Sequence, residues 1–396
     1  MWLHGELLAL VLLQVAFLII FTGAILFSTR GQKTARMISV AVLAAITHGA
    51  QSQCLGILSN PHWRAIATPL CWIQFLSASQ LTLSASTFEL NFRQPFPGHW
   101  SRACLVLPML WNLRRVGTPL LAKNTPPSPK QSRLRFISER LLTTTLAYLT
   151  LDLIVSSPAP SVAMVGHPKQ TLWNFHALSR EDFVFRMIAT ATFWISVALL
   201  LLIINNCAAI LGVICGCYSP GDCPPLFGSF VDVKSIRQFW GAAWHQCLRV
   251  TLTTHANILV DLVFRITGET ALSKYTRLWC AFMISALIHH SSDIAMGIDQ
   301  TEAGSALFFS LQALGIMLED GFQAFVYRFP LKRKGQRWNK ARLFGRLWVI
   351  SFLVWSTPTW SYPQQRLGVD AAMLLPVRIT PILVHAIARL FPAISA

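Results

Sequence analysis

Residues 187–213 read MIATATFWISVALLLLIINNCAAILGV and form the most apolar run of the chain. Asp, Glu, Lys and Arg do not occur anywhere within this run. A helix needs about 20 mainly apolar residues to cross the hydrocarbon core of a bilayer. The run is therefore long enough to span a membrane as a single helix, and it predicts an integral membrane protein.

The composition of the whole chain supports the membrane interpretation. Of its 396 residues, 54% are hydrophobic and only 12% are charged, with a mean hydropathy of +0.50. Soluble globular domains carry about 25% charged residues. The net charge of +17 could indicate nucleic-acid binding, but the basic residues cluster between apolar runs. That pattern is typical of cytosolic loops facing anionic lipid, so we expect a lipid bilayer as partner and no nucleic acid.

Further apolar runs predict an all-α, polytopic membrane protein with roughly eight or nine transmembrane helices. The first run lacks the basic flank and small-residue cleavage site of a signal peptide, so we interpret it as a retained span. Besides residues 187–213, the expected spans are Leu7–Phe27, Met37–Leu58, Ile66–Phe88, Leu141–Val155, Leu278–Met296, Leu307–Val326, Leu347–Trp360 and Ala371–Leu390.

Basic residues between the spans predict the orientation of the chain. Arg30, Lys33 and Arg36 follow the first span and place its C-terminal end in the cytosol. Counting spans from there makes three basic segments cytosolic and residues 156–185 luminal. The cytosolic segments are residues 93–140, residues 217–277, provided that Thr251–Ile266 does not cross the membrane, and residues 328–346. We expect one domain over residues 1–396, with 217–300 as its catalytic core region and 93–140 as a basic cytosolic loop.

The segment CAFMISALIHHSSD, residues 280–293, places two histidines deep in a predicted span. Ionisable groups within a span are costly and usually face an internal cavity, so they are functional-site candidates. His289 and Asp293 are four residues apart and share a helix face, where the carboxylate could fix the imidazole tautomer. The alternative is a buried structural histidine. We expect His290, about 100° further around the helix, to be structural.

The segment SIRQFWGAAWHQCLR, residues 235–249, predicts an amphipathic helix at the membrane interface. One apolar face forms at three- and four-residue spacing from Ile236, Phe239, Trp240, Ala243, Trp244 and Cys247. Tryptophan beside arginine at a membrane boundary favours the headgroup level. This account does not require His245, which the pattern alone leaves equally as a polar rim residue or a catalytic partner.

Other patterns carry weaker predictions. Glu319 and Asp320, near the end of a span, could be paired helix-end groups or part of a cavity wall. The cysteines are dispersed without the paired spacing of zinc sites, and the histidines lack the regular spacing of membrane di-iron enzymes. We therefore expect no metal. The sequence contains none of the lipase-elbow or nucleotide-binding motifs.

The two histidine segments together resemble a known family. SIRQFWGAAWHQ resembles the S-x-R-x-F-W-G-x-x-W-H pattern of wax synthase-like proteins, relatives of the membrane-bound O-acyltransferases. FMISALIHHSSD resembles that family's F-x-x-S-G-x-x-H segment, with Ala286 in place of its glycine. The resemblance extends over residues 70–365 through MLWNLRRVGTP, YLTLDLI, CPPLFGSF and FFSLQALGIMLED, and is nearest to fungal acetyltransferases of terpenoid and meroterpenoid biosynthesis.

This resemblance implies a function for the site. Such a protein would transfer acetyl from acetyl-CoA to a hydroxyl of an apolar polycyclic intermediate at the endoplasmic reticulum membrane, without a permanently bound cofactor. The resemblance makes His289 the main catalytic residue and His245 its partner. A buried neutral imidazole suits a general base, and Asp293 would stabilise the imidazolium. We expect an acetyl-CoA-binding set of Arg237, Trp240, Trp244 and Arg249, with the two arginines meeting the CoA phosphates.

Two other functions remain open from the sequence. A long-chain wax or sterol ester synthase would use the same chemistry with a longer acyl tunnel. A transporter or non-catalytic membrane scaffold could also contain an intramembrane histidine and aspartate. The sequence shows neither matching broken helices nor an inverted repeat, which disfavours the transporter.

Overall fold

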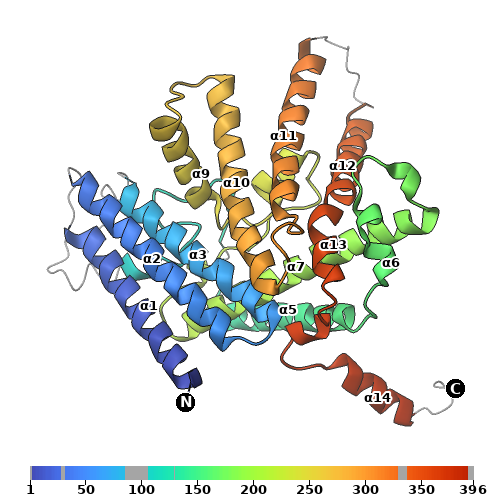
Figure 1. Cartoon of the computed structure of the whole chain (residues 1–396), viewed down its shortest axis with the longest axis horizontal. Helices are drawn as coiled ribbons and strands as arrows, with labels where there is room; N and C mark the ends of the chain where they lie inside the picture. Colours follow the sequence, from blue (N-terminus) through green and yellow to red (C-terminus); the bar gives the residue numbers. More distant parts are fainter. Residues whose placement is uncertain (1, 28–31, 85–105, 129, 329–336, 391–396) are drawn as a thin grey trace. The chain divides into compact units, whose positions relative to one another are not determined.

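The computed structural model describes residues 2–27, 32–84, 106–128, 130–328 and 337–390 (Figure 1). Within these ranges the chain is helical with turns between the helices, and no β-strand occurs. The all-α prediction is confirmed for this part of the chain. Two compact units form, one from Met1–Thr125 with Ser235–Gly335 and one from Pro126–Lys234 with Gln336–Ala396. The expectation that residues 1–396 form one domain stays a prediction.

The first unit is a set of long helices that pack in sequence. α1 packs on α2, α2 on α3, α3 on α10, and α10 on α11 (Figure 1). The shorter α9 also packs on α10. The bounds of these helices are α1 Trp2–Phe27, α2 Lys33–Ile57, α3 Pro61–Leu83, α9 Arg249–Ile258, α10 Ala271–Met296 and α11 Ser305–Arg328.

Local capping determines where α10, the helix that carries His289, begins and ends. The Thr270 hydroxyl accepts a hydrogen bond from the backbone N–H of Ser273 at 3.1 Å, which satisfies one of the free donors of the first turn. At the other end Gly297 has a φ of 106°, a left-handed conformation that glycine adopts without a steric penalty. The helix is therefore bounded by sequence features at both ends.

A buried arginine anchors the turn-rich segment 106–125 to α3. The Arg115 side chain is fully buried, and its Nη2 donates to the Ser77 hydroxyl at 3.0 Å while its Nε donates to Gln80 Oε1 at 3.1 Å. Its Nη1 donates to the Asn112 carbonyl at 3.0 Å. Burial lowers the pKa of Arg115 to about 10, so the guanidinium is still charged near neutral pH. These bonds fix a loop whose last residues reach the candidate site.

The second unit is organised around the long helix α7. It packs along α5 and also contacts α12 and α13. A capping box begins α7: the Ser179 hydroxyl accepts from the backbone of Asp182, whose carboxylate accepts from the backbone of Ser179. The bounds are α5 Arg133–Val155, α6 Val162–Val165, α7 Arg180–Ile214, α12 Arg337–Ser356, α13 Pro358–Arg366 and α14 Thr380–Leu390.

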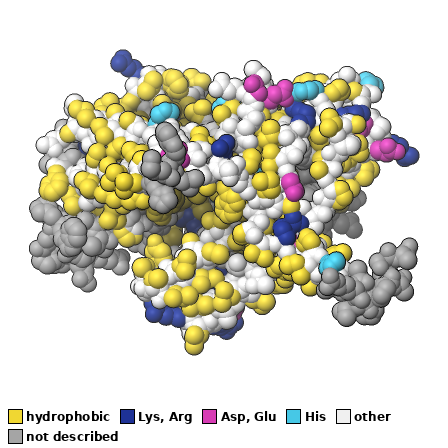
Figure 2. Space-filling view, turned by 60° about the horizontal axis from the view of Figure 1, so that its bottom comes forward, with side chains coloured by type: hydrophobic (Ala, Val, Ile, Leu, Met, Phe, Trp, Pro, Cys, Tyr) yellow, Lys and Arg dark blue, Asp and Glu magenta, His cyan; other side chains and the backbone are white. Residues whose placement is uncertain are grey.

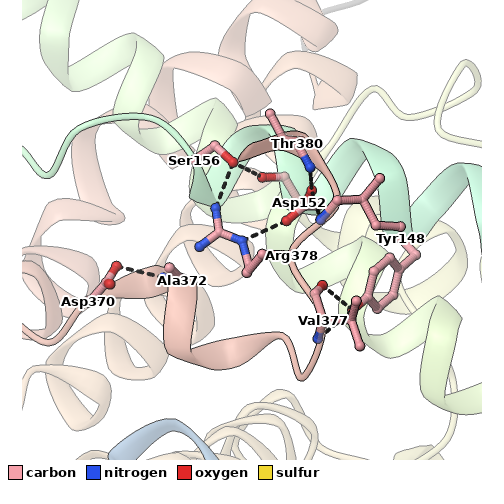
Figure 3. Close-up of polar contacts among 9 residues, drawn as sticks. Tyr148, Asp152, Ser156, Asp370, Ala372, Val377, Arg378 and Thr380 are labelled. Carbon is pink, nitrogen blue, oxygen red and sulfur yellow. Dashed lines mark hydrogen bonds and ion pairs between the residues drawn. The ribbon is translucent and has the colours of Figure 1, made fainter. Parts of the chain in front are cut away.

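A buried carboxylate on α5 holds the start of α14 (Figure 3). Asp152 accepts from Arg378 Nε at 2.7 Å and from the backbone N–H groups of Ile379 and Thr380. Tyr148 adds a second contact, because its hydroxyl donates a hydrogen bond to the Val377 carbonyl at 2.6 Å. The carboxylate thus satisfies free donors at a helix N-terminus, as a capping residue does.

Three of the expected spans coincide with helices that are long and apolar enough to cross a membrane by length and composition. Within the described residues these are Gly5–Phe27, Lys33–Ile57 and Arg180–Ile214, the last containing the run 187–213. Many large apolar side chains on them are exposed, among them Ile19 and Leu211, and hydrophobic side chains cover much of the surface in Figure 2. Such exposure suits contact with lipid.

Three further expected spans lie within long helices but are not among those three. Leu141–Val155 lies in α5, Leu278–Met296 in α10 and Leu307–Val326 in α11. Their membrane crossing stays a prediction. Ile66–Phe88 begins in α3, and its last residues lie outside the described ranges.

Two spans near the C-terminus differ from the prediction. Leu347–Trp360 is divided between α12 and α13, because Pro358 lacks the N–H that a continuing helix would use. Ala371–Leu390 is wrong as a single span: a short 3₁₀ turn, Ala371–Leu374, is followed by a bend at residues 375–377 and then by α14. The 11 residues of α14 cover about 16 Å, against a hydrocarbon core of about 30 Å.

Candidate active site

A cavity of about 400 Å³ lies within the first unit, between α10, α11 and the segment after Ser235. Aromatic and aliphatic side chains make up most of its wall, and a few polar groups face it. Its lining includes Asn124, Arg237, Trp240, Trp244, His245, Gln246, Arg249, Leu252, Leu278, Phe282, Ser285, His289, Phe309 and Ile316. A largely apolar cavity with few polar groups is the usual form of a small-molecule site.

The segment 235–249 is not the continuous amphipathic helix that its spacing predicts. Only Ile236–Gln238 is α-helical (α8), and Phe239–Ala243 follows as a π-helical turn. The backbone N–H of Trp244 donates to the carbonyl of Phe239 at 2.8 Å, after which the chain leaves the helix. His245 therefore lies in an irregular stretch. A π-turn of this kind is frequent at functional sites.

Side chains replace the hydrogen bonds that a longer helix would have made. Gln246 Nε2 donates to the carbonyl of Trp240 at 3.1 Å and to that of Trp244. The Gly241 carbonyl accepts from Arg249 Nη1 at 2.6 Å and from Asn124 Nδ2 at 2.7 Å. These bonds explain why the helical prediction fails: the carbonyls are satisfied without an α-helix.

The apolar face predicted for this segment exists, but it packs against protein. Ile236, Phe239, Ala243 and Trp244 are each at most 6% exposed. Trp240 lies edge-on to Phe282, with ring centroids 5.9 Å apart, in a larger aromatic cluster. The exposed apolar face that the pattern predicts is therefore wrong for these side chains, because tertiary packing has covered it. The position of the segment at the headgroup level stays a prediction.

Two carboxylates in the second half of α11 hold the beginning of this segment. Glu319 accepts from the backbone N–H of Ile236 at 2.7 Å and of Arg237 at 3.2 Å. Asp320 forms a two-point ion pair with the Arg237 guanidinium, at 3.0 and 2.6 Å, and also accepts from Lys274. Neither role that the sequence left open for this pair matches, because both residues lie inside α11, which continues to Arg328, and neither lines the cavity.

His289 and His245 face the same cavity. The His289 ring is stacked on Phe309 with centroids 4.7 Å apart and an interplanar angle of 12°. The His245 ring lies against Trp244 at 5.5 Å. The two imidazoles are close enough to interact electrostatically. The fold thus brings together two histidines that are far apart in the sequence.

The surroundings of His245 favour its neutral form. Burial and the nearby Arg114 guanidinium lower the pKa of His245 to about 4. Its Nδ1 is buried and has no hydrogen-bond partner among the described residues. A neutral imidazole carries one N–H donor and one acceptor nitrogen. His245 can therefore donate to, or accept from, a molecule in the cavity at neutral pH.

The remaining predicted residues divide into two groups. Arg237, Trp240, Trp244 and Arg249 all line the cavity with the two histidines. Asp293 is buried on α10, 1% exposed, and is not among the lining residues. Its expected hydrogen bond to His289 stays a prediction. His290 is half-buried outside the cavity lining, and no group of three potential metal ligands occurs in the described part of the chain.

Several lining residues were not anticipated from the sequence. Ser285 lies one helical turn before His289, and that spacing alone could have indicated it. Gln246 is adjacent to His245 in the sequence, and that position alone could have indicated it. Asn124 comes from a distant loop, and its contact with Gly241 has no signal in the local sequence.

Comparisons with known proteins point in one direction. A sequence profile described as the membrane bound O-acyl transferase family matches residues 223–311, which include both cavity histidines. The chain is 32% identical over 354 residues to the acetyltransferase atnC of Arthrinium sp, covering 86% of this chain and 80% of that protein.

Two similar proteins come from Aspergillus fumigatus. The acetyltransferase spyB is 30% identical over 276 residues, covering 64% of this chain and 46% of that protein. The acetyltransferase pyr8 is 29% identical over 284 residues, covering 68% of this chain and 66% of that protein. The similarity thus extends well beyond the segment with the two histidines.

Proposed function

The chain belongs to the membrane-bound O-acyltransferase family, and we propose on that premise that it acetylates a hydroxyl of an apolar polycyclic terpenoid or meroterpenoid. Membership makes it a membrane-bound enzyme with an acyl-CoA donor, related to fungal acetyltransferases. The donor in our proposal is acetyl-CoA, and the membrane is the endoplasmic reticulum. The observation that carries the proposal is the pair of imidazoles on one largely apolar cavity.

The cavity supports acyl transfer to an apolar alcohol through its wall. Trp240, Phe282 and Phe309 offer rigid aromatic surfaces to a hydrophobic acceptor. The Trp240 indole is held in place because its Nε1 donates to Gln312 Oε1 at 3.1 Å. Exclusion of water by such a wall favours attack by the alcohol over hydrolysis of the thioester.

In the proposed reaction His289 is the general base. It takes the proton of the acceptor hydroxyl as the oxygen attacks the thioester carbonyl carbon, which activates an otherwise poor nucleophile. The tetrahedral intermediate then breaks its carbon–sulfur bond, and the proton passes to the departing CoA thiolate. The products are the acetyl ester and free CoA. No acyl-enzyme is required, because the thioester is already activated.

His245 is the proposed partner of His289. Its neutral imidazole can direct an N–H toward the carbonyl oxygen, where negative charge develops during attack. Donors fixed in position before the reaction stabilise that charge without reorganisation. The π-turn, the Gln246 bonds and the α11 carboxylates are what hold the backbone around His245.

Of the two arginines proposed to meet the CoA phosphates, Arg237 is the better placed. Its side chain is 42% exposed despite the ion pair with Asp320, so part of the guanidinium can meet a phosphate. Arg249 is half-buried, and its Nη1 already donates to Gly241 and Gln246. We therefore assign Arg249 to positioning the π-turn and Arg237 to phosphate binding.

Replacing His289 by alanine tests the proposed function. Microsomes containing the wild type are incubated with radiolabelled acetyl-CoA and a panel of polycyclic alcohols, and in parallel with palmitoyl-CoA. We expect acetyl ester formation by the wild type and a loss of at least about 100-fold in His289→Ala, because general-base assistance is removed.

The control is His290→Gln, which changes the adjacent imidazole outside the cavity lining. We expect it to retain most of the activity, provided that gel filtration shows a folded protein. Wild-type turnover of palmitoyl-CoA in preference to acetyl-CoA would overturn the acetyl donor. Full activity of folded His289→Ala would overturn the general base.

A further inference from the structure

The C-terminal end of α7 carries two exposed thiols that the proposed function does not use. α7 is long and apolar enough to cross a membrane, and it ends at Ile214. Cys215 and Cys217 come directly after this end, and both are free and exposed. The two thiols therefore lie at the point where a membrane-spanning α7 would leave the hydrocarbon core.

Local hydrogen bonds fix the turn that presents these thiols. The backbone N–H of Cys215 donates to the Leu211 carbonyl at 2.9 Å, and the backbone N–H of Cys217 donates to the Gly212 carbonyl at 2.9 Å. Gly216 lies between them with a φ of 75°, a left-handed conformation that glycine adopts without a steric penalty. The backbone of the turn is thus held in place while both cysteine side chains stay exposed.

The groups around the turn are those expected at the boundary between lipid tails and headgroups. On α7, Leu211 and Ile214 are 61% and 60% exposed, which suits contact with lipid. The basic beginning of α5 lies beside the turn, because Arg133 Nη2 is 3.8 Å from the position that a Cβ on Gly216 would take. Arginines at the end of a span favour anionic headgroups. Apolar and basic groups of one unit therefore meet at these thiols.

We propose that Cys215 and Cys217 are a site of S-acylation by a long-chain fatty acyl group. Thiols next to a membrane span are the ones that reversible S-acylation modifies. The predicted orientation places this end of α7 in the cytosol, where fatty acyl-CoA is available. The attached chain would enter the bilayer beside the exposed Ile214 side chain.

The modification is a thioester exchange with fatty acyl-CoA, carried out by a protein S-acyltransferase of the cell. The cysteine sulfur attacks the carbonyl carbon of the fatty acyl thioester. A carbon–sulfur bond forms to the cysteine, the carbon–sulfur bond to CoA breaks, and the thiol proton passes to the departing CoA thiolate. Neither cavity histidine takes part, so the proposal is independent of acetyl transfer.

Depth in the membrane distinguishes these two thiols from another exposed cysteine of α7. Cys207 is also free and exposed. At 1.5 Å per residue it lies about 12 Å from Cys215 along the helix axis, toward the middle of the span. A thiol at that depth would be surrounded by hydrocarbon, away from the polar CoA moiety. The proposal therefore assigns the modification to Cys215 and Cys217 and leaves Cys207 unmodified.

The central test replaces Cys215 and Cys217 together by serine, with Cys207→Ser as the matched control. The full chain is produced in fungal cells that are fed an alkyne analogue of palmitate, purified, and coupled to a fluorophore. Neutral hydroxylamine cleaves thioesters, so the label that it removes is the label bound to cysteine. We expect this label on the wild type, a fall of at least about fivefold in the double variant, and no change in Cys207→Ser.

Two further measurements separate the modification from chemistry in the cavity. His289→Ala should carry the same hydroxylamine-sensitive label as the wild type. The double serine variant should retain an acetyl-transfer rate within about threefold of the wild type, because neither thiol lines the cavity. If the wild type transfers no acetyl group, the proposed function fails while the labelling result still decides this proposal.

Four outcomes would overturn the proposal, each in protein that gel filtration shows to be folded. The first is a wild type without hydroxylamine-sensitive label, and the second is an equal label in the double serine variant. The third is a loss in Cys207→Ser as large as in the double variant, which would place the modification elsewhere on α7. The fourth is loss of the label in His289→Ala, which would assign the thioester to the cavity.

Discussion

The position of His245 shows how burial determines what an imidazole can do. An ordinary histidine titrates at about 6.5, and burial beside Arg114 lowers the pKa of His245 to about 4. The ring is therefore neutral at cytosolic pH. It can serve as a hydrogen-bond donor without adding a second positive charge next to the guanidinium.

The lowered pKa of His245 predicts how stability depends on pH. Between pH 6.5 and pH 4 the unfolded chain binds a proton that the folded chain does not, so the folded state loses stability as the pH falls. At pH 5 the loss is about 2 kcal/mol for this group. Thermal unfolding in detergent should show a larger drop in Tm from pH 7 to pH 5 for the wild type than for His245→Gln. An equal drop in Tm for the two proteins would contradict the lowered pKa of His245.

Residue-level patterns predicted part of the site and missed part of it. Helical spacing and burial drew attention to His289, and the resemblance to known acyltransferases added His245; both line the cavity. Asp293 follows the same spacing but does not line the cavity. A four-residue interval predicts that two residues share a helix face, but it does not predict which neighbouring elements pack against that face. Asn124 could not be predicted, because loop contacts depend on tertiary structure.

At the scale of elements, the π-turn Phe239–Ala243 is held by α11. The carboxylate of Glu319 accepts two backbone N–H groups at the start of α8, and Asp320 pairs with Arg237. Removal of these contacts would free the segment that carries His245. The proposed reaction needs that segment in a fixed position, because a displacement of about 1 Å can cost about 100-fold in rate.

Glu319→Gln tests whether these contacts of α11 hold the segment that carries His245. The Gln amide nitrogen cannot accept a backbone N–H, so one hydrogen bond to a charged group is lost, with about 1.5–3 kcal/mol of stability. We expect a lower Tm and an acetyl-transfer rate reduced by at least about tenfold. Glu269→Gln, which removes an exposed carboxylate in the loop before α10, should change neither quantity. A Tm of Glu319→Gln equal to that of the wild type would contradict a stabilising role for the Glu319 hydrogen bonds.

The elements also show where sequence patterns suffice. The run 187–213 lies within α7, because a long stretch of apolar residues without charges has few other stable forms in lipid. The segment 235–249 has equally regular spacing but adopts a π-turn and an irregular stretch. Its carbonyls accept hydrogen bonds from the side chains of Gln246, Arg249 and the distant Asn124 instead of from helical N–H groups. Those bonds depend on the assembled fold, so the local pattern does not predict them.

At the scale of the whole molecule, the orientation in the membrane would determine how the two proposed substrates reach the site. Acetyl-CoA is a polar molecule of the cytosol, whereas a polycyclic alcohol partitions into the bilayer. The basic segments 93–140, 217–277 and 328–346 predict a cytosolic side, and 156–185 a luminal side. In that orientation the segment with His245 lies on the acetyl-CoA side. An apolar acceptor could enter from the lipid.

Inserted glycosylation sites test this orientation. An Asn-X-Ser acceptor with flexible flanks, inserted after Pro160, should be glycosylated in microsomes because residues 156–185 are predicted to face the lumen. The same insert after Thr125, in the basic segment 93–140, should stay unmodified. The measurement is a gel-mobility shift that is reversed by endoglycosidase, together with an acetyl-transfer assay to show that each variant is folded. The opposite pattern in active variants would invert the topology and place the His245 segment away from cytosolic acetyl-CoA.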